Sequence, residues 1–543
     1  MKRQGLMMVA LGMALAMLSS TVLAGDQCTE PVSTQQGSYS GAKDPGFASC
    51  VYKGIPFAQA PMGDLRFARP LPPSSHQGVI QALKFGPACP QKEDITMGGK
   101  AESYSEDCLN LNVWRPAKSG SFPVMVWLYG GGFAGGSGSF DIYNGAHLAS
   151  REDVVIVTIN YRLSSLGFLA LPELKSEDKN MSTGNMGILD QIRALEWVRD
   201  NIAGFGGDPG NVTVFGQSAG AMSICTLLAS PEAKGLFHRA MMMSGPCRLM
   251  TTLEDGYRKS RAFAATLGCE GPEVLKCLRS KPTEAFVKKA ANDMLAGGTG
   301  WAPTVDGSVL TAMPVELIQQ GKYNQVPIII GTTRDELRSY AIAIPGLGLW
   351  SKSMVNGLMK MLAGDNAPQI LAMYDYQEFR RPIDLAFAFG NQMTFDAPAF
   401  LMAQAMAGKN PVYWYRFDWD ETRMPHKIGA MHAIDVPFVF GALNADSRLM
   451  KLLASKKTVE KATPLAYAMM KYAAEFARTG NPNSDGQPKW PAYTTEKKER
   501  IYLDDPITVR PLSEAEVKRY QWYAEHSFED VMAGKLSQSI ESK

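Results

Sequence analysis

The sequence has 543 residues, of which 45% are hydrophobic and 20% are charged, so it can bury a large core. Its 55 lysine and arginine residues nearly balance its 53 aspartate and glutamate residues, for a formal net charge of +2. This balance offers no basic surface to nucleic acid, so we expect no nucleic-acid partner. After the N-terminal region no uninterrupted apolar segment reaches about 18 residues, so no transmembrane anchor is predicted.

The first 24 residues have the pattern of a secretory signal peptide. Met-Lys-Arg is a basic start, residues 6–18 are an apolar stretch too short to span a bilayer, and Val-Leu-Ala at 22–24 is a small-residue cleavage signal. Removal of residues 1–24 takes away the first Lys and Arg and no acidic residue, which leaves the mature chain neutral. We expect one large domain over residues 25–543, located in the periplasm or secreted.

An apolar strand pattern at residues 124–129 runs directly into a glycine-rich segment at residues 130–136. Rigid backbone N–H groups in a dry site stabilise a developing negative oxygen by about 3–4 kcal/mol per donor. We expect Gly131 and Gly132 to supply such N–H groups. A flexible loop and a phosphate cradle are the other interpretations, but a phosphate cradle would close with Gly-Lys-Ser/Thr, and this segment does not.

Apolar strands alternate with helical stretches along the chain. Strands are predicted at residues 124–129, 154–160, 212–215, 326–330 and 411–417, and an amphipathic helix at residues 188–198. The alternation is typical of an α/β protein with helices packed on a mostly parallel sheet. Residues 337–400 are predicted to form a helical cap inserted over the site.

The most specific motif is Gly-Gln-Ser-Ala-Gly at residues 216–220, between a predicted strand and a helix-like stretch. A serine hydroxyl is a weak nucleophile that must stand on a sharp strand-to-helix turn, and small residues on both sides allow that turn. We predict that Ser218 is the nucleophile and that the N–H group of Ala219 helps to bind the oxyanion. A surface turn is the alternative interpretation of the pentapeptide alone.

These motifs resemble the type-B carboxylesterases, which include the cholinesterases and the bacterial p-nitrobenzyl esterases. The resemblance covers nearly the whole mature chain, with further matching segments at residues 54–58, 61–67, 105–113, 205–209 and 235–240. It implies an α/β-hydrolase fold with a helical cap, and hydrolysis of a small-molecule ester through a covalent acyl-enzyme intermediate. We expect no cofactor and no metal ion.

The base and the acid are assigned through the same resemblance. The chain has histidines at positions 76, 147, 238, 426, 432 and 526. In the resembled family the base lies in Gly-x-x-His, near a strand ending in Phe-Val-Phe-Gly; residues 429–432 and 438–441 match these patterns. The base is therefore His432. The acid is Glu336, which follows a predicted strand, and its neighbour Asp335 is the rival candidate.

One position beside the nucleophile departs from the resembled family. Most members have Glu where this chain has Gln217, so a negative charge usually found near the base is absent. The amide can form a hydrogen bond, but it cannot stabilise a protonated histidine by charge. Ser244 is expected to make a hydrogen bond in the surroundings of the triad.

Eight cysteines in an exported chain favour disulfides over metal binding, since the sequence has no Cys-x-x-Cys or His-Glu-x-x-His pattern. The expected pairs are Cys89–Cys108, beside the mouth of the site, and Cys269–Cys277, both suggested by the resemblance, and Cys28–Cys50, a local hypothesis. For Cys225 and Cys247 the sequence leaves both a bond and free buried thiols open.

Two segments bear on substrate preference. In cholinesterases a tryptophan between the cysteines that correspond to Cys89 and Cys108 binds a quaternary ammonium. The matching residues 90–104 contain no tryptophan, so no preference for choline esters is expected. Residues 297–300 are Gly-Gly-Thr-Gly where cholinesterases have bulky aromatics, so acyl groups larger than acetyl are expected to fit, unless these glycines only form a surface turn.

The sequence thus predicts a secreted or periplasmic serine carboxylesterase. The alternative among enzymes is a lipase that acts on longer-chain lipid esters and carries a long apolar lid. The alternative outside enzymes is a non-catalytic binding relative, which would lack Ser218 or His432. Both residues are present.

Overall fold

The structure is a computed structural model that describes residues 27–92, 99–245, 247–248, 250–295, 300–338, 346–526 and 531. Some predictions fall outside the described residues. These are the signal peptide, residues 93–98 of the cysteine loop, residues 297–299 of the glycine segment and residues 339–345 of the predicted cap.

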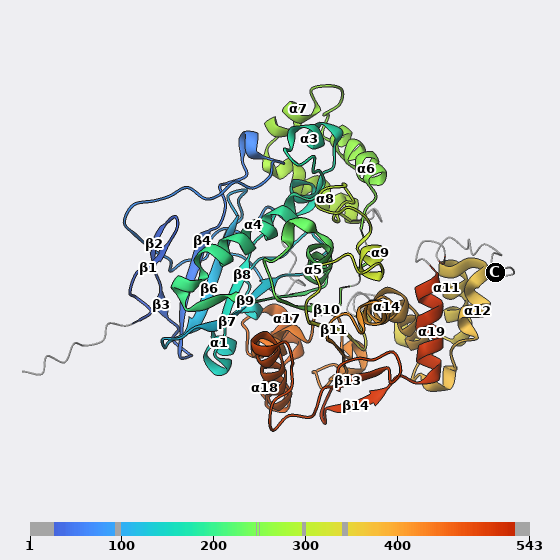
Figure 1. Cartoon of the computed structure of the whole chain (residues 1–543). Coiled ribbons are helices and arrows are strands. Elements are labelled where there is room, and N and C mark those ends of the chain that lie inside the picture. Colours follow the sequence, from blue (N-terminus) through green and yellow to red (C-terminus); the bar gives the residue numbers. More distant parts are fainter. Residues whose placement is uncertain are drawn as a thin grey trace, which may run out of the picture.

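Most strands belong to one sheet (Figure 1). They are β3 (Ala42–Lys43), β4 (Ser49–Pro56), β6 (Asn110–Pro116), β7 (Phe122–Leu128), β8 (Val155–Ile159), β9 (Gly207–Gln217), β10 (Arg239–Met243), β11 (Ile328–Thr333), β12 (Val412–Phe417), β13 (Glu499–Leu503) and β14 (Thr508–Pro511). Their order is β14-β13-β12-β11-β10-β9-β7-β8-β6-β4-β3 among the described residues. A separate small sheet contains β1 (Val32–Thr34), β2 (Gly37–Ser40) and β5 (Val79–Gln81).

The centre of the large sheet is parallel and its two edges are antiparallel. Every neighbouring pair from β8 through β7, β9, β10, β11 and β12 to β13 is parallel. The pairs β3–β4, β4–β6, β6–β8 and β13–β14 are antiparallel. The central strands β7 and β8 are buried almost throughout, which explains their continuous apolar sequences. The five predicted strands correspond to β7, β8, β9, β11 and β12, with ends that differ by a few residues.

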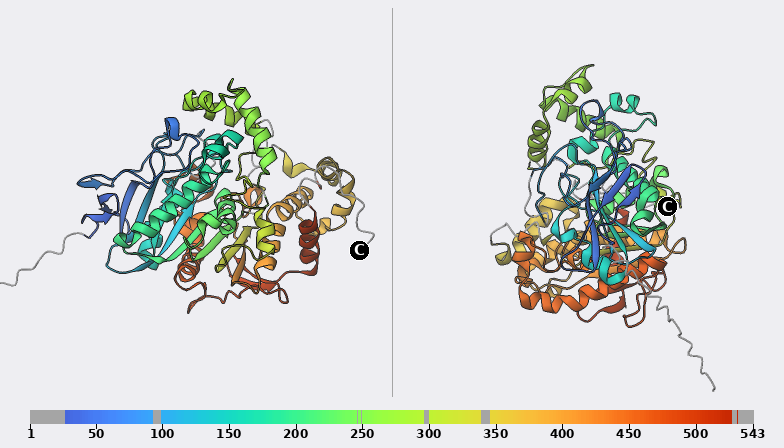
Figure 2. Two further views of the ribbon diagram at one scale, coloured as in Figure 1. Left: turned by 45° about the horizontal axis from the view of Figure 1, so that its top comes forward. Right: turned by 90° about the vertical axis from the view of Figure 1, so that its left-hand side faces the viewer.

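Helices cover both faces of the sheet (Figures 1 and 2). They are α1 (Ala146–Glu152), α2 (Ser164–Phe168), α3 (Pro172–Glu177), α4 (Met186–Asn201), α5 (Ala219–Ala229), α6 (Leu253–Thr266), α7 (Val274–Ser280), α8 (Thr283–Leu295), α9 (Pro314–Gln319), α11 (Lys352–Ala363), α12 (Ala367–Leu371), α13 (Pro382–Asn391), α14 (Ala397–Met406), α15 (Pro425–Ile428), α16 (Val436–Phe440), α17 (Arg448–Leu453), α18 (Lys456–Thr479) and α19 (Glu514–Glu525). In Figure 1, α4 and α5 lie above the strands, and α1 and α18 lie below them. The predicted helix at 188–198 lies within α4.

One expectation from the sequence is wrong. Residues 438–441 were expected to end a strand, but residues 436–440 form the buried helix α16, which begins with Pro437 in its first turn and packs against α18. A short apolar run fits a buried strand and a buried helix equally well, and the proline favours the helix start. In the predicted cap, α11 packs against α12 and α13, and α14 packs against β11, β12 and α19.

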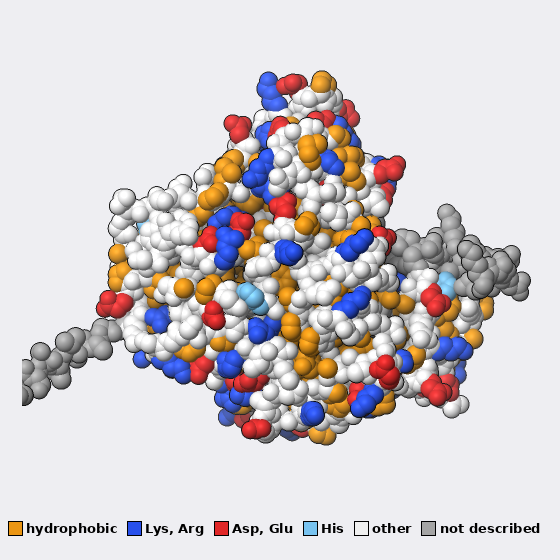
Figure 3. Space-filling view, viewed as in Figure 1, with side chains coloured by type: hydrophobic (Ala, Val, Ile, Leu, Met, Phe, Trp, Pro, Cys, Tyr) orange, Lys and Arg blue, Asp and Glu red, His pale blue; other side chains and the backbone are white. Residues whose placement is uncertain are grey.

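The face shown in Figure 3 carries acidic and basic side chains side by side. In the structure, Arg69 contacts Asp178 at 3.1 Å and Glu232 at 2.6 Å, and Arg279 contacts Glu177 at 2.7 Å. These residues line a surface cleft of about 680 Å³ between residues 64–72 and α4. Because the charges in the cleft pair with one another, they present no field of a single sign.

Candidate active site

The serine of the pentapeptide lies on a sharp turn between β9 and α5. Ser218 has φ 54° and ψ −121°, a strained backbone conformation for a residue with a side chain. A Cβ atom on Gly220 would lie 1.9 Å from the carbonyl oxygen of Leu128, and one on Gly216 would lie 2.7 Å from the same oxygen. Both positions therefore require glycine, because the turn presses directly against the end of β7.

Strand register brings the site together at the carboxyl ends of the parallel strands. Met243 at the end of β10 is paired with Gln217 of β9 on one side and with Gly331 of β11 on the other. The Ser218 N–H group donates to the carbonyl oxygen of Met243 at 2.9 Å. The residue that follows β9 is thereby held at the end of β10, one strand away from β11.

His432 and Glu336 meet at this edge. The Nδ1 atom of His432 lies 2.5 Å from Oε2 of Glu336, and the N–H group of Thr333 donates to Oε1 of the same carboxylate at 2.7 Å. The Glu336 side chain is fully buried, and the His432 side chain is 10% exposed. The imidazole is therefore oriented by a carboxylate that cannot turn toward solvent.

Asp335, the rival of Glu336, points elsewhere. Its carboxylate pairs with Arg334 and Arg338 at 2.9 Å each, and it accepts a hydrogen bond from the N–H group of Ala430 at 3.0 Å. Its own N–H group donates to the carbonyl oxygen of Ala430 at 2.9 Å. Asp335 thus fixes the loop that carries His432, while the next side chain, from Glu336, reaches the imidazole.

Gln217 contacts the other nitrogen of the imidazole. Its Nε2 atom lies 3.0 Å from Nε2 of His432, and only 4% of the residue is exposed. A Cβ atom on Gly130 would lie 2.7 Å from Oε1 of Gln217. The side chain therefore lies between the glycine-rich loop and the histidine.

The glycine-rich loop turns directly after β7. Gly131 and Gly132 have φ values of 120° and 59°, and the carbonyl oxygen of Gly131 accepts from the N–H groups of Ala134 at 3.0 Å and Gly135 at 3.1 Å. Ala219 is the first residue of α5, where backbone N–H groups have no acceptor within the helix. The loop and the helix start both adjoin Ser218, since a Cβ atom on Gly130 would lie 3.0 Å from the Cβ atom of Ser218.

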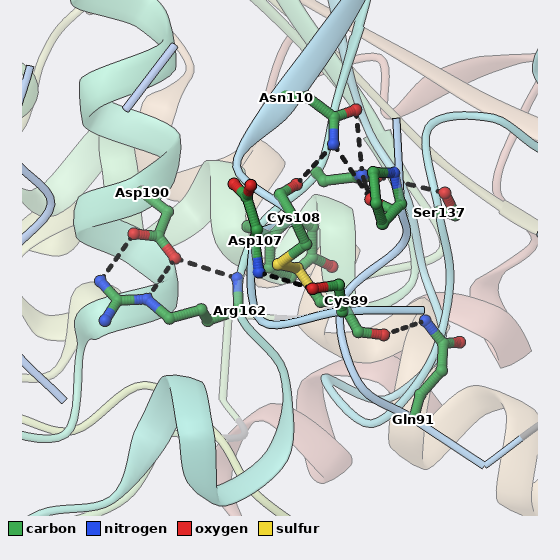
Figure 4. Close-up of a disulfide and its surroundings, with 12 residues drawn as sticks. Cys89, Gln91, Asp107, Cys108, Asn110, Ser137, Arg162 and Asp190 are labelled. Atoms are coloured by element: carbon green, nitrogen blue, oxygen red, sulfur yellow. Dashed lines mark hydrogen bonds and ion pairs between the residues drawn. A yellow bond between two sulfur atoms is a disulfide. The ribbon is translucent and has the colours of Figure 1, made fainter. Parts of the chain in front are cut away.

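Figure 4 shows the Cys89–Cys108 disulfide with the side chain of Gln91 beside it. The Gln91 side chain donates to the carbonyl oxygen of Gly136 at 2.8 Å and accepts from the N–H group of Gly136 at 2.8 Å. It also donates to the carbonyl oxygen of Cys89 at 3.0 Å. The disulfide therefore lies beside the glycine-rich loop, next to the site, as the resemblance suggested.

The sequence analysis did not predict two buried carboxyl groups near Glu336. Burial raises the pKa of Asp435 to about 7, and the nearby Glu336 adds to this increase. The Asp435 carboxyl accepts a hydrogen bond from the hydroxyl of Tyr415 at 2.8 Å. Burial also raises the pKa of Asp396 to about 6, and this carboxyl accepts from the hydroxyl of Thr332 at 2.6 Å. Single acidic residues in apolar segments carry no sequence signal for such a cluster.

Two further neighbours of the site are an aromatic ring and a serine. Phe395, in the segment predicted as a cap, lies with its ring centroid 5.3 Å from that of His432. The expectation for Ser244 is wrong: among the described residues its buried hydroxyl has no hydrogen-bond partner. Its backbone N–H group instead donates to the carbonyl oxygen of Gly331 at 2.8 Å, so its contribution is to strand pairing.

The described cysteines form four disulfides: Cys28–Cys50, Cys89–Cys108, Cys225–Cys247 and Cys269–Cys277. The third resolves the alternative left open by the sequence in favour of a bond, which ties α5 to the segment after β10. In the described ranges, no group of three or more His, Cys, Asp or Glu side chains could hold a metal ion. Of the helices described, none is long and apolar enough to cross a membrane.

A mostly parallel sheet with helices on both faces and a serine on the turn after a central strand define the α/β-hydrolase fold, as predicted. Solved structures agree: a PNB esterase structure matches with a TM-score of 0.78 at 36% identity, over 91% of this chain and 99% of that chain.

Sequence comparisons define the family. The sequence model of the "Carboxylesterase family" matches residues 29–520. Para-nitrobenzyl esterase of Bacillus subtilis (strain 168) is 37% identical over 496 residues, which cover 90% of this chain and 97% of that protein. Acetylcholinesterase of Bungarus fasciatus is 32% identical over 539 residues, which cover 91% of this chain and 86% of that protein. The chain belongs to the carboxylesterase family and is a serine carboxylesterase.

Proposed function

We propose that this carboxylesterase hydrolyses small-molecule esters through a covalent acyl-enzyme on Ser218, with His432 as the base and Glu336 as the acid. One observation carries the proposal. The imidazole of His432 lies between the Glu336 carboxylate, 2.5 Å from Nδ1, and the end of β9, where Gln217 next to Ser218 lies 3.0 Å from Nε2. This is the orientation that a base needs beside a nucleophile on a strand-to-helix turn.

The first half-reaction acylates the serine. The Ser218 hydroxyl oxygen attacks the ester carbonyl carbon while Nε2 of His432 takes the hydroxyl proton, and Glu336 stabilises the imidazolium that forms. The bond to the alcohol oxygen then breaks. His432 returns its proton to that oxygen, so the alcohol leaves neutral and the acyl group remains on Ser218.

The second half-reaction reverses these roles with water as the nucleophile. His432 takes a proton from water, and the water oxygen attacks the acyl carbon. The bond from the acyl carbon to the Ser218 oxygen then breaks, His432 returns the proton to Ser218, and the acid leaves. In both halves the carbonyl oxygen becomes negative. The N–H groups of Gly131, Gly132 and Ala219 stabilise it, by about 3–4 kcal/mol per donor.

A fluorophosphonate probe tests the nucleophile directly. It should label Ser218 in the purified protein, and Ser218→Ala should lose both the label and turnover of a p-nitrophenyl ester, by about 10⁴-fold or more. Ser176→Ala is the matched control, because Ser176 is exposed on α3 and its hydroxyl donates to the carbonyl oxygen of Pro172 in the same helix. Label on another serine, or near-normal turnover in Ser218→Ala, would refute the mechanism.

An ester panel tests the substrate class. We expect kcat/KM to rise from acetyl to butyryl p-nitrophenyl esters, because each buried methylene contributes up to about 0.8 kcal/mol. A choline ester should show no advantage over a neutral ester of equal size. Strong activation by emulsified long-chain substrate would instead favour the lipase alternative.

We propose that the protein is exported, because a chain with four disulfides is expected to fold in an oxidising compartment. N-terminal sequencing of the protein from the periplasm or the medium should begin at Gly25. Full-length protein in the reducing cytosol, starting at Met1, would contradict both the export and the cleavage site.

A further inference from the structure

Both ring nitrogens of His432 have a polar partner, and one of them is Gln217. The carboxylate of Glu336 lies 2.5 Å from Nδ1, and the amide nitrogen of Gln217 lies 3.0 Å from Nε2. In the proposed mechanism Nε2 is the atom that takes the proton from Ser218. Gln217 therefore contacts the same atom that the reaction uses.

The amide of Gln217 has a defined orientation. Its Oε1 atom lies against Gly130, where any Cβ atom would come within 2.7 Å of it, and its Nε2 atom faces the imidazole. An amide nitrogen can only donate a hydrogen bond. The contact thus requires a lone pair on Nε2 of His432, which places the imidazole proton on Nδ1, facing Glu336. This is the tautomer that can accept a proton from Ser218.

The surroundings of the imidazole contain acidic side chains from several elements. Glu336 follows β11, and Asp435, at the start of α16, interacts electrostatically with the imidazole. Asp396, at the start of α14, acts on Glu336. The Asp335 carboxylate is occupied by two arginines. A further carboxylate 3 Å from Nε2 would stabilise the imidazolium strongly, because opposite charges at this distance favour the charged form.

We propose that Gln217 is a positioning residue: its neutral amide fixes the reactive tautomer of His432, and it lets ester hydrolysis continue to lower pH than a carboxylate at the same place would. The inference rests on the proposed function of Ser218 and His432. On this view the hydrogen bond from the Gln217 amide to Nε2 of His432 breaks when the substrate binds and the Ser218 hydroxyl approaches the imidazole. The length of the side chain matters for the contact, and its lack of charge matters for the pH range.

Two variants separate charge from contact, measured by the pH dependence of kcat/KM for a p-nitrophenyl ester. Gln217→Glu keeps the shape of the side chain and adds a charge. The acidic limb of its kcat/KM–pH profile should therefore move to higher pH by about one unit. Gln217→Met keeps the length but has neither charge nor donor. Its acidic limb should coincide with that of the wild type, while its plateau kcat/KM falls about 3–10-fold through loss of the tautomer contact.

The outcomes distinguish this inference from the proposed function. Fluorophosphonate labelling of Ser218 in all three proteins tests the mechanism; absence of the label from the wild type would overturn the mechanism and the inference together. With labelling intact, an unmoved acidic limb in Gln217→Glu overturns the charge argument. Equal shifts in both variants would indicate a merely structural role, and a wild-type plateau in Gln217→Met would overturn the tautomer contact. The expected pattern is a shift in Gln217→Glu alone and a loss of rate in Gln217→Met.

Discussion

The nucleophile side of the site is built from backbone contacts, whereas the base side is built from charged side chains. On the first side, Gly216 and Gly220 press against the end of β7, and the expected oxyanion donors are N–H groups. On the second side, Glu336 orients His432, and Asp335 holds the loop through two arginines and a backbone N–H group. The two sides should therefore respond differently to substitution: the first through sterics, the second through charge and pH.

The largest effect is expected on the base side. Glu336→Gln keeps the shape but removes the charge that stabilises the imidazolium, so kcat/KM should fall by about 10⁴-fold with little change in the unfolding midpoint. Asp335→Asn is the matched control, because this neighbour points at Arg334, Arg338 and Ala430. It should cost less in rate than Glu336→Gln, because the Asp335 carboxylate holds the loop that carries His432 and not the imidazole itself. A larger loss of rate in Asp335→Asn than in Glu336→Gln would exchange their roles.

On the nucleophile side, a substitution that introduces a steric clash should disrupt the turn at Ser218. Gly220→Ala places a Cβ atom 1.9 Å from the Leu128 carbonyl oxygen, a backbone atom that cannot move aside. We expect a loss of at least about 3 kcal/mol in the free energy of unfolding, measured by urea denaturation, and a loss of fluorophosphonate labelling. Gly357→Ala in α11 is the control, since its Cβ would meet no atom within 4 Å, and it should stabilise by about 0.5–1 kcal/mol. Equal stability of the two variants would contradict the close contact.

This contrast also explains what could be predicted from the sequence. The turn at Ser218 and the strands around it were predicted because glycine spacing and apolar runs act locally. Glu336 was chosen over Asp335 only through resemblance; the reason it faces His432 is the backbone pairing of Asp335 with Ala430. Asp435 and Asp396 escaped prediction because their burial depends on segments distant in the chain. The helix at 436–440 was mistaken for a strand because five buried residues have no clear period.

The disulfide between Cys225 and Cys247 tests whether the nucleophile side needs a covalent tie. It joins α5, which follows Ser218, to the segment after β10 across a separation of 22 residues. The double variant Cys225→Ala/Cys247→Ala should lose about 3 kcal/mol in the free energy of unfolding and some kcat/KM. Cys269→Ala/Cys277→Ala, with a separation of 8 residues, should lose less and keep the rate. Equal losses of rate in the two double variants would show that the Cys225–Cys247 disulfide has no specific role in the active site.

The smallest effect should come from a buried acid on the base side. Burial raises the pKa of Asp435 to about 7 in the folded protein, against an ordinary value near 3.8. Between about pH 4 and pH 7 the folded state therefore holds a proton that the unfolded state has lost, so stability falls as pH rises through this range and is constant above it. Asp435→Asn removes this dependence. The variant should gain on the wild type as pH rises from about 4 to 7, and its advantage should then stay constant above about pH 7.

Urea denaturation of both proteins from pH 4 to pH 8 measures this difference. Asp396, whose pKa burial raises to about 6, acts in the same direction but is present in both proteins, so it cancels. The Asn side chain can still accept from the Tyr415 hydroxyl, which bonds to Asp435 at 2.8 Å, so the contact itself is preserved. A difference that stays flat over the whole range would mean that Asp435 is ionised like an exposed acid. The base side would then be held by hydrogen bonds alone. It would differ from the nucleophile side because its contacts come from side chains instead of the backbone, and charge would not be part of the difference.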